Sequence, residues 1–237
     1  MKEIIQIAGI RDLAEAQMIA AAGVHQIGFP LRLSIHAEDI SEKETAAIIA
    51  CLPPHVAALL ITYIEDAEEI RELSAALGVR RVQLHSQPSA ASVARLRRID
   101  PQMVVIKSLI VREENLSDLL ADLHAYSPFV DAFITDTYDP VTGASGATGK
   151  IHNWDISRGI VEVSRRPVIL AGGLNPGNVR DAIMQVRPAG VDVHTGVEGS
   201  DGRKDERLVK SFVAEAKAAF TRISQSIRRY PRRNGMR

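Results

Sequence analysis

Several residue types and motifs are scarce in this chain, and each shortage excludes a class of protein. Among the 237 residues there is one cysteine, Cys51, so no disulfide can form within the chain and we expect a reducing, cytoplasmic setting. Positive and negative side chains are equal in number, at 29 each, which argues against a general binder of nucleic acid or of anionic membranes. No apolar run approaches the roughly 20 residues of a membrane span, and the residues after Met1 lack the long apolar stretch of a signal peptide.

Motifs for the common cofactors are missing as well. The sequence contains neither the glycine fingerprint of dinucleotide-binding folds nor a clustered set of metal ligands, so we expect no cofactor and no metal. Residues 143–150 resemble a nucleotide phosphate loop only superficially, because they follow a polar loop instead of a strand.

Strand-like and helix-like stretches alternate along almost the whole chain, which predicts parallel α/β structure. Short apolar runs of strand type occur at 4–8, 24–29, 56–62, 81–85, 103–109, 131–136, 167–171 and 190–194. Eight strand–helix units are the count of a closed barrel, so we predict an α/β fold, a single (β/α)8 TIM barrel over residues 1–224. An open doubly wound sheet is the alternative, although it would not normally need eight units.

Two segments lack the periodicity of the rest. Residues 137–153 are rich in glycine and threonine, and loops of that length inside compact domains are usually functional or disordered. Residues 225–237 carry several arginines without apolar periodicity, and we predict a solvated, disordered basic tail there. A weak anion-binding arm is the functional alternative for the tail.

A glycine pair closes the seventh predicted strand. Residues 168–176 read Val-Ile-Leu-Ala-Gly-Gly-Leu-Asn-Pro, so the apolar run breaks at Gly172 and Gly173. Asn175 is a good N-cap and Pro176 suits the first helical position, and we therefore predict that a helix begins there.

Thr195 and Gly196 close the eighth predicted strand in a similar way. Glycines let backbone N–H groups approach an anion closely, and a helix N-terminus adds a favourable dipole. Barrel enzymes frequently bind phosphate after strands seven and eight. We predict a phosphate site at these two turns, with ordinary turn glycines as the alternative.

Ligands of a (β/α)8 barrel bind where the strands end, so the polar residues at those positions are candidates for the site. They are Arg11, Arg32, His85, Lys107, Asp136, Asp192, His194 and Thr195. Asp136 ends an apolar strand, where a partly desolvated carboxyl can have a raised pKa and act as a general acid. A turn or helix-capping aspartate is the alternative. Asp192 lies inside the eighth strand, where a charge is costly to bury unless it is paired or used.

Other candidates have two interpretations each. The guanidinium of Arg32 can fork onto a substrate carboxylate or phosphate, or it can form a surface ion pair. His85 and His194 are either site residues or neutral, hydrogen-bonded histidines at strand ends. Cys51 falls in a predicted outer helix and is interpreted as structural.

Taken together, these motifs resemble phosphoribosylanthranilate isomerase, the barrel enzyme of tryptophan biosynthesis, from Ile5 to about Phe220. The best match is Gly-Gly-Leu-Asn-Pro-Gly-Asn-Val at 172–179. Further matching stretches lie at 7–10, 83–85, 106–107, 135–137, 146–149 with Trp154, 187–188, 191–193, 196–198 and 204–205.

The resemblance implies an Amadori rearrangement of a phosphorylated sugar derivative. A general acid protonates the furanose ring oxygen, the ring opens to a Schiff base, and a general base removes the C2 proton. The resemblance puts Asp136 in the acid role and Arg32 on the anthranilate carboxylate. It implies that the substrate phosphate is held by Gly173, Thr195 and Gly196. We predict His85, Gly172 and Asp192 as further substrate-binding residues. We expect a phosphorylated small-molecule substrate and a monomer or homodimer.

One departure from the family bears directly on the chemistry. The family's base is a cysteine on the first strand, and here that position is Ala8, whose methyl group cannot accept a proton. Loss of a positioned acid or base typically costs about 10²–10⁴-fold in rate. Gln6 stands where a lysine is usual and His194 where serine is common, while the phosphate glycines are kept.

Three hypotheses follow from this departure. The first is an isomerase with a weak residual rate or with His85, His194 or a water in place of the usual base. The second is a different phosphosugar lyase, epimerase or isomerase on the same barrel, with Asp136 as acid and a histidine as base. The third is a non-catalytic phospho-ligand-binding protein or partner subunit.

Overall fold

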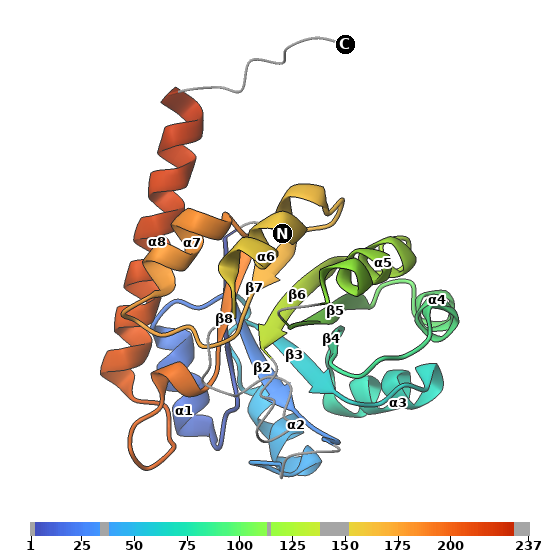
Figure 1. Cartoon of the computed structure of the whole chain (residues 1–237). Helices are drawn as coiled ribbons and strands as arrows, with labels where there is room; N and C mark the ends of the chain where they lie inside the picture. Colours follow the sequence, from blue (N-terminus) through green and yellow to red (C-terminus); the bar gives the residue numbers. More distant parts are fainter. Residues whose placement is uncertain (1–2, 34–37, 113–114, 138–151, 230–237) are drawn as a thin grey trace.

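Eight parallel strands close into one barrel, and a helical layer surrounds it (Figure 1). The computed structural model describes residues 3–33, 38–112, 115–137 and 152–229. For residues 227–229 it describes the backbone only. Neighbouring strands pair in sequence order from β1 to β8, and β8 pairs back with β1. The predicted single (β/α)8 barrel is therefore confirmed. The loop at 138–151 and the tail at 230–237 lie outside the described residues.

The elements alternate without exception from β1 to β8. The strands are β1 (Ile4–Ala8), β2 (Gln26–Pro30), β3 (Ala57–Thr62), β4 (Arg81–Leu84), β5 (Val104–Val111), β6 (Ala132–Thr137), β7 (Val168–Leu170) and β8 (Gly190–Val193). The helices are α1 (Leu13–Ala21), α2 (Glu42–Ala50), α3 (Ala67–Leu77), α4 (Ala90–Ile99), α5 (Leu116–Tyr126), α6 (Trp154–Val163), α7 (Val179–Val186) and α8 (Glu206–Arg229), with a short 3₁₀ turn, η1 (Thr195–Val197), between β8 and α8.

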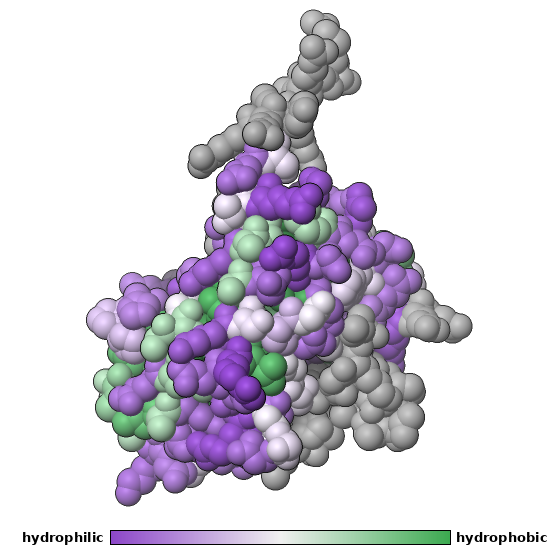
Figure 2. Space-filling model, turned by 90° about the vertical axis from the view of Figure 1, so that its left-hand side faces the viewer, coloured by the Kyte–Doolittle hydropathy of each residue, from purple (hydrophilic) through white to green (hydrophobic). Residues whose placement is uncertain are grey.

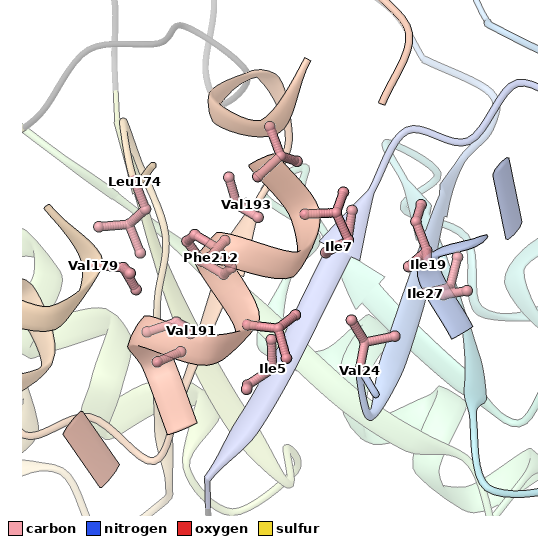
Figure 3. Packing of buried hydrophobic residues seen from close by; sticks show 14 of the residues in the cluster. Ile5, Ile7, Ile19, Val24, Ile27, Leu174, Val179, Val191, Val193 and Phe212 are labelled. Atoms are coloured by element: carbon pink, nitrogen blue, oxygen red, sulfur yellow. The ribbon is translucent and has the colours of Figure 1, made fainter. Parts of the chain in front are cut away.

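Apolar side chains fill two separate spaces because successive strand residues point to opposite faces of the sheet. One set packs inside the barrel and includes Ala8, Leu59, Ile106 and Ile169. The other set packs between barrel and helices, where Ile5, Ile7, Val191 and Val193 meet the apolar side of α8 around Phe212 (Figure 3). This alternation decides which strand residues face the interior and can form a site.

Local capping signals fix where several helices begin and end. Asp12 caps α1 by accepting a hydrogen bond from the backbone N–H of Glu15, as its position predicts. Ser41 and Glu44 form a reciprocal capping box at the start of α2. Gly78 ends α3 in a left-handed conformation with φ of 73°, which glycine adopts without a steric penalty.

The last helix is longer than predicted. Helix α8 continues to Arg229, five residues beyond the predicted boundary at 224 between barrel and tail. The residues beyond 224 include good helix formers, and the first proline comes only at position 231. Figure 2 shows that the surface on this side of the molecule is mostly hydrophilic, because α8 turns its apolar side toward the barrel. In the described part of the chain, no helix combines the length and apolar character needed to cross a membrane.

Candidate active site

Two aspartates face the barrel interior near the carboxyl ends of their strands. Asp136 in β6 is 7% exposed and Asp192 in β8 is 8% exposed. Strand β7 lies between them, and its register with both strands places Asp136, Ala171 and Asp192 in one row. Only the methyl group of Ala171 therefore separates the two carboxyl groups along the barrel wall.

Asp136 has the surroundings of a carboxyl that keeps its proton. Burial raises its pKa above the ordinary value, while the nearby His85 and the backbone N–H of Thr137 oppose this rise. That N–H donates to Oδ1 of Asp136 at 2.8 Å. The raised pKa predicted from the sequence is present, and its main cause is desolvation.

His85 lies beside Asp136 at the end of β4, in the buried interior. Its Nδ1 is 3.0 Å from Oγ of Ser108, and its ring meets the ring of Tyr63 edge-on with 5.0 Å between centroids. Burial, together with the charge of Asp136, raises the pKa of Tyr63 to about 12. Asp136, His85 and Tyr63 therefore form one electrostatically linked group.

Asp192 is less well supplied with partners than Asp136. Its Oδ1 is buried and has no hydrogen-bond partner among the described residues. Burial and the charge of Asp136 raise the pKa of Asp192 to about 7, against opposition from the Gln6 amide, Lys204 and the backbone N–H of Val193. This carboxyl changes its charge near neutral pH, which a reactive group requires.

A chain of polar side chains lies deeper in the barrel. Gln6 donates to Gln83 at 3.4 Å and accepts from Gln26, and Gln83 donates to Oγ of Ser108 at 3.2 Å. Arg81 reaches the other end of this chain through Gln26, at 3.4 Å. We did not single out this network from the sequence. The available signal was that these strands carry a polar residue at inward positions, in step with the two-residue period.

The predicted phosphate turns lie against each other. Gly172 and Gly173 have φ values of 97° and 64°, in the region that favours glycine. A Cβ built on Gly196 would lie 1.9 Å from the carbonyl oxygen of Leu174, so only glycine allows the two turns to approach this closely. Within the described residues, the backbone N–H groups of Gly173, Thr195 and Gly196 donate no hydrogen bond.

The helix after these turns begins later than predicted. Asn175 and Pro176 do not start α7, whose N-cap position is Asn178. Instead, the side chain of Asn175 accepts from the backbone N–H of Gly177 at 2.8 Å, and Asn178 binds the backbone of Asn175 and Gly173. Asparagine forms such local turns as readily as helix caps, which explains the error. The asparagines instead brace the glycine turn.

Arg32 forms the ion pairs that were the alternative interpretation of its role. Its Nε is 2.8 Å from Glu42 and its Nη1 is 2.6 Å from Glu69, on helices α2 and α3. The side chain is 38% exposed. Nothing in the described structure directs the guanidinium toward Asp136, and carboxylate binding by Arg32 stays a prediction.

The turn after β8 contains an ion cluster that sequence reasoning missed. The ring of His194 lies against Gly9, where a Cβ would be 2.0 Å from Nε2, and that Nε2 is 3.5 Å from Oε1 of Glu198. Lys204 is almost fully buried and donates to the same Glu198 oxygen at 2.7 Å and to the carbonyl of His194 at 3.0 Å. A lysine and a glutamate six residues apart in an irregular segment give no periodic signal that would have predicted the pair.

Arg11, the other candidate near this turn, pairs with Asp39 at 3.3 Å.

Lys107 lies on the opposite side of the barrel wall from the site. It belongs to the outward set of β5, and its Nζ lies 5.5 Å from the ring centre of Tyr126 in α5. Its inclusion among the polar residues at the site was therefore wrong. The strand period explains the error, because the residue next to Ser108 must point outward when Ser108 points inward.

Ala8 lies in the interior and offers no group that could exchange a proton. It is 3% exposed and pairs with Gly28 of β2.

Cys51 is exposed at the C-terminal end of α2, in the outer helical layer. Within the described ranges, no group of three or more histidine, cysteine or acidic side chains could hold a metal ion.

Comparisons with known proteins agree on one family. The sequence model described as N-(5'-phosphoribosyl)anthranilate (PRA) isomerase matches residues 5–215. The curated N-(5'-phosphoribosyl)anthranilate isomerase 2 of Methanosarcina mazei is 40% identical over 223 residues, which cover 92% of this chain and 96% of that protein. The enzyme of the same name from Haloferax volcanii is 34% identical and covers 91% of this chain and 93% of its own.

Solved structures lead to the same family. Phosphoribosyl anthranilate isomerase from Thermotoga maritima is 31% identical, with a TM-score of 0.78 over 91% of this chain and 99% of that one. A second phosphoribosyl anthranilate isomerase structure, in complex with reduced 1-(o-carboxyphenylamino)-1-deoxyribulose 5-phosphate, is 29% identical, with a TM-score of 0.75 and the same coverage. With the family model covering most of the sequence, this chain belongs to the N-(5'-phosphoribosyl)anthranilate isomerase family.

Proposed function

We propose that the protein isomerises N-(5'-phosphoribosyl)anthranilate to 1-(o-carboxyphenylamino)-1-deoxyribulose 5-phosphate. Membership of the family supports this proposal, as does the similarity to an isomerase structure that holds the reduced form of the second compound. The observation in this chain that carries the proposal is the buried Asp136, whose pKa is raised, in the barrel interior near the end of β6.

Asp136 has the properties that the ring-opening step needs. A protonated carboxyl donates its proton to the furanose ring oxygen as the C1–O bond breaks and the anthranilate nitrogen supplies the electron pair for the Schiff base. Burial favours the protonated form of Asp136, and His85 beside it tunes that preference. We assign Asp136 as the general acid.

The glycine turns supply a place for the phosphate. Backbone N–H groups without internal partners can donate to the phosphate oxygens, and the left-handed glycines remove the side chains that would block their approach. We assign phosphate binding to Gly173, Thr195 and Gly196, with Gly172 shaping the turn. Thr137 Oγ1 lies 2.1 Å from where a Cβ on Gly172 would be, so this approach requires glycine.

Turnover of freshly generated N-(5'-phosphoribosyl)anthranilate tests the proposal. Wild-type protein should form the deoxyribulose phosphate, identified by mass and chromatography, and Asp136→Asn should lower kcat by about 10²–10⁴-fold. Asp181→Asn, at an exposed position in the first turn of α7, serves as the matched control and should change nothing. Absence of turnover by the wild type would overturn the proposal.

Ala8 favours one second candidate, a different isomerisation of a phosphosugar on the same barrel. A methyl group replaces the family's thiol there, so the substrate could differ while the phosphate turns are kept. Under this candidate the protein binds sugar phosphates but turns over none of the anthranilate compound. We expect a monomer or homodimer under either candidate.

A further inference from the structure

We infer that Asp192 is the general base that removes the C2 proton, in place of the absent thiol at position 8. This inference rests on the proposed function and deepens it. The two aspartates in the barrel interior then divide the reaction, with Asp136 acting on the ring oxygen and Asp192 on the carbon.

Position is the first argument. Asp192 lies in β8 directly beside Gln6 of β1, and Ala8 is the next inward residue along that strand. The Asp192 carboxyl therefore faces the interior at the level of Gln6, which is two residues before Ala8 along β1. It shares its row with Asp136, so one sugar bound across the row can reach both carboxyl groups.

The hydrogen bonding of Asp192 is the second argument. A buried carboxylate oxygen without a partner loses its solvation and gains no hydrogen bond in return. Oδ1 of Asp192 is in that condition among the described residues, although the carboxyl is more than nine-tenths buried. A proton acceptor for a substrate carbon needs such an oxygen, because a saturated carboxylate has no lone pair left to use.

The histidines near the site are engaged elsewhere. His85 is 3.0 Å from Ser108 and edge-on to Tyr63, and its charge acts on Asp136. His194 lies over Gly9 with its Nε2 toward Glu198. His152 is the exception, because its Nε2 is 2.5 Å from Oγ of Ser157 while its Nδ1 has no partner among the described residues and lies beside Gly172. Burial lowers the pKa of His152 to about 4, which is too low for an efficient base near neutral pH. Asp192 is the remaining acid–base group of the described interior beside β1.

The charges that face Asp192 suit a base that works near neutral pH. Asp136 faces it from β6, Lys204 from the segment after β8, and the neutral amide of Gln6 from β1. The strand between the aspartates contributes only Ala171. With two carboxyl groups so close in a buried site, ionising both is unfavourable, and the pair is expected to share one proton.

Sharing one proton balances the reaction. Protonated Asp136 gives its proton to the ring oxygen, and ionised Asp192 then takes the proton from C2. The C2–H electron pair forms the C1–C2 double bond, and the C1=N pair returns to nitrogen. The resulting enol gives its hydroxyl proton to the ionised Asp136, and C1 takes the proton from Asp192, which gives the ketone. Both carboxyl groups thereby return to their starting protonation states.

An experiment that replaces the Asp192 carboxylate by a thiol at position 8 tests this inference. Asp192→Asn should lower kcat by about 10²–10⁴-fold, while binding of the reduced product analogue is unchanged. Adding Ala8→Cys to Asp192→Asn should restore turnover. In the wild type, kcat/KM should fall above about pH 7, where the aspartate pair loses its shared proton, whereas in the rescued double variant it should rise toward the thiol value of about 8.5.

Each result distinguishes a role of Asp192 as the base from a merely structural role. A merely structural role for Asp192 would not allow rescue by a thiol, nor would it give the rescued variant a different pH profile. His194→Gln serves as the control and should keep the wild-type pH profile. Full kcat in Asp192→Asn, or its loss without rescue by Ala8→Cys, would overturn the base assignment alone. Absence of turnover by the wild type would overturn the proposed function as well.

Discussion

Across the single residue Ala171, negative charge on Asp136 raises the pKa of Asp192. The two carboxyl groups belong to different strands and would be independent if either pointed into the helical layer. Both point into the barrel, where little water screens them. This coupling makes one of them a proton donor and leaves the other to accept a proton near neutral pH.

The buried carboxyl of Asp192 should reduce stability above its pKa. Its pKa is 3.8 when exposed and about 7 in the fold, so the folded state binds more protons between these values and stability falls as pH rises through that window. The difference corresponds to at most about 4 kcal/mol. Asp192→Asn should therefore increase the free energy of unfolding at pH 8 by on the order of 1–3 kcal/mol.

Urea denaturation at pH 4 and at pH 8 measures this effect. The gain from Asp192→Asn should be present at pH 8 and largely absent at pH 4, where the aspartic acid is already protonated. Asp181→Asn, at an exposed position, should show no such difference. A gain of equal size at both pH values would contradict the electrostatic cause.

Gly196 and Gly159 make a matched pair for the phosphate turns. A Cβ at Gly196 would lie 1.9 Å from the Leu174 carbonyl oxygen, whereas a Cβ at Gly159 in α6 meets nothing within 4 Å. Gly196→Ala should weaken binding of the reduced product analogue and destabilise the fold by about 1–3 kcal/mol. Gly159→Ala should leave binding intact and stabilise by up to about 1 kcal/mol. Calorimetric titration and thermal unfolding measure both, and unchanged affinity in Gly196→Ala would argue against a phosphate site there.

Lys107 should be a cost to the fold and irrelevant to turnover. Burial lowers its pKa from 10.5 to about 8, so stability from this group rises as pH increases through that window. Lys107→Met should add on the order of 1–3 kcal/mol at pH 7, reduced by the loss of its attraction to Asp122. Chemical denaturation and kcat/KM check both parts, with the exposed Lys210→Met as control. A large fall in kcat/KM would show that this lysine acts inside the barrel.

The effect of an Arg32 substitution on KM distinguishes the two interpretations of the role of this residue. If it binds the anthranilate carboxylate, Arg32→Met should raise KM by about 10–100-fold, as expected for the loss of a charged hydrogen bond. Binding of inorganic phosphate should not change, because the phosphate turns lie on other strands. If its ion pairs with Glu42 and Glu69 are its whole role, KM should stay as in the wild type and only stability should fall slightly.

Local rules and strand counting predicted most of the fold. The capping box at Ser41 and Glu44 depends on four neighbouring residues, so it is visible in the sequence. Asp136 was a candidate because it ends an apolar strand, although a turn or capping role was the alternative, and its role as general acid stays a prediction. Other residues offer choices that the sequence does not resolve. Asn175 could cap or turn, and Arg32 could pair with any acidic residue that the fold brought near.

The shared proton of the two aspartates depends on the register of three strands. No local pattern shows that Asp136 and Asp192 occupy one row with Ala171 between them, because the two residues are far apart in the sequence. The unpartnered Oδ1 of Asp192 is likewise a property of the assembled interior. The resemblance implies that a base is missing at Ala8, and the strand register of the closed barrel is what supports our inference that Asp192 replaces it.

The most direct test of a thiol-independent isomerase is the pH dependence of kcat/KM after alkylation of Cys51, the sole and exposed cysteine. We predict that the alkylated protein turns over N-(5'-phosphoribosyl)anthranilate like the untreated one, with kcat/KM falling above about pH 7 as the aspartate pair loses its shared proton. Inactivation on alkylation, or no turnover at any pH, would contradict this account.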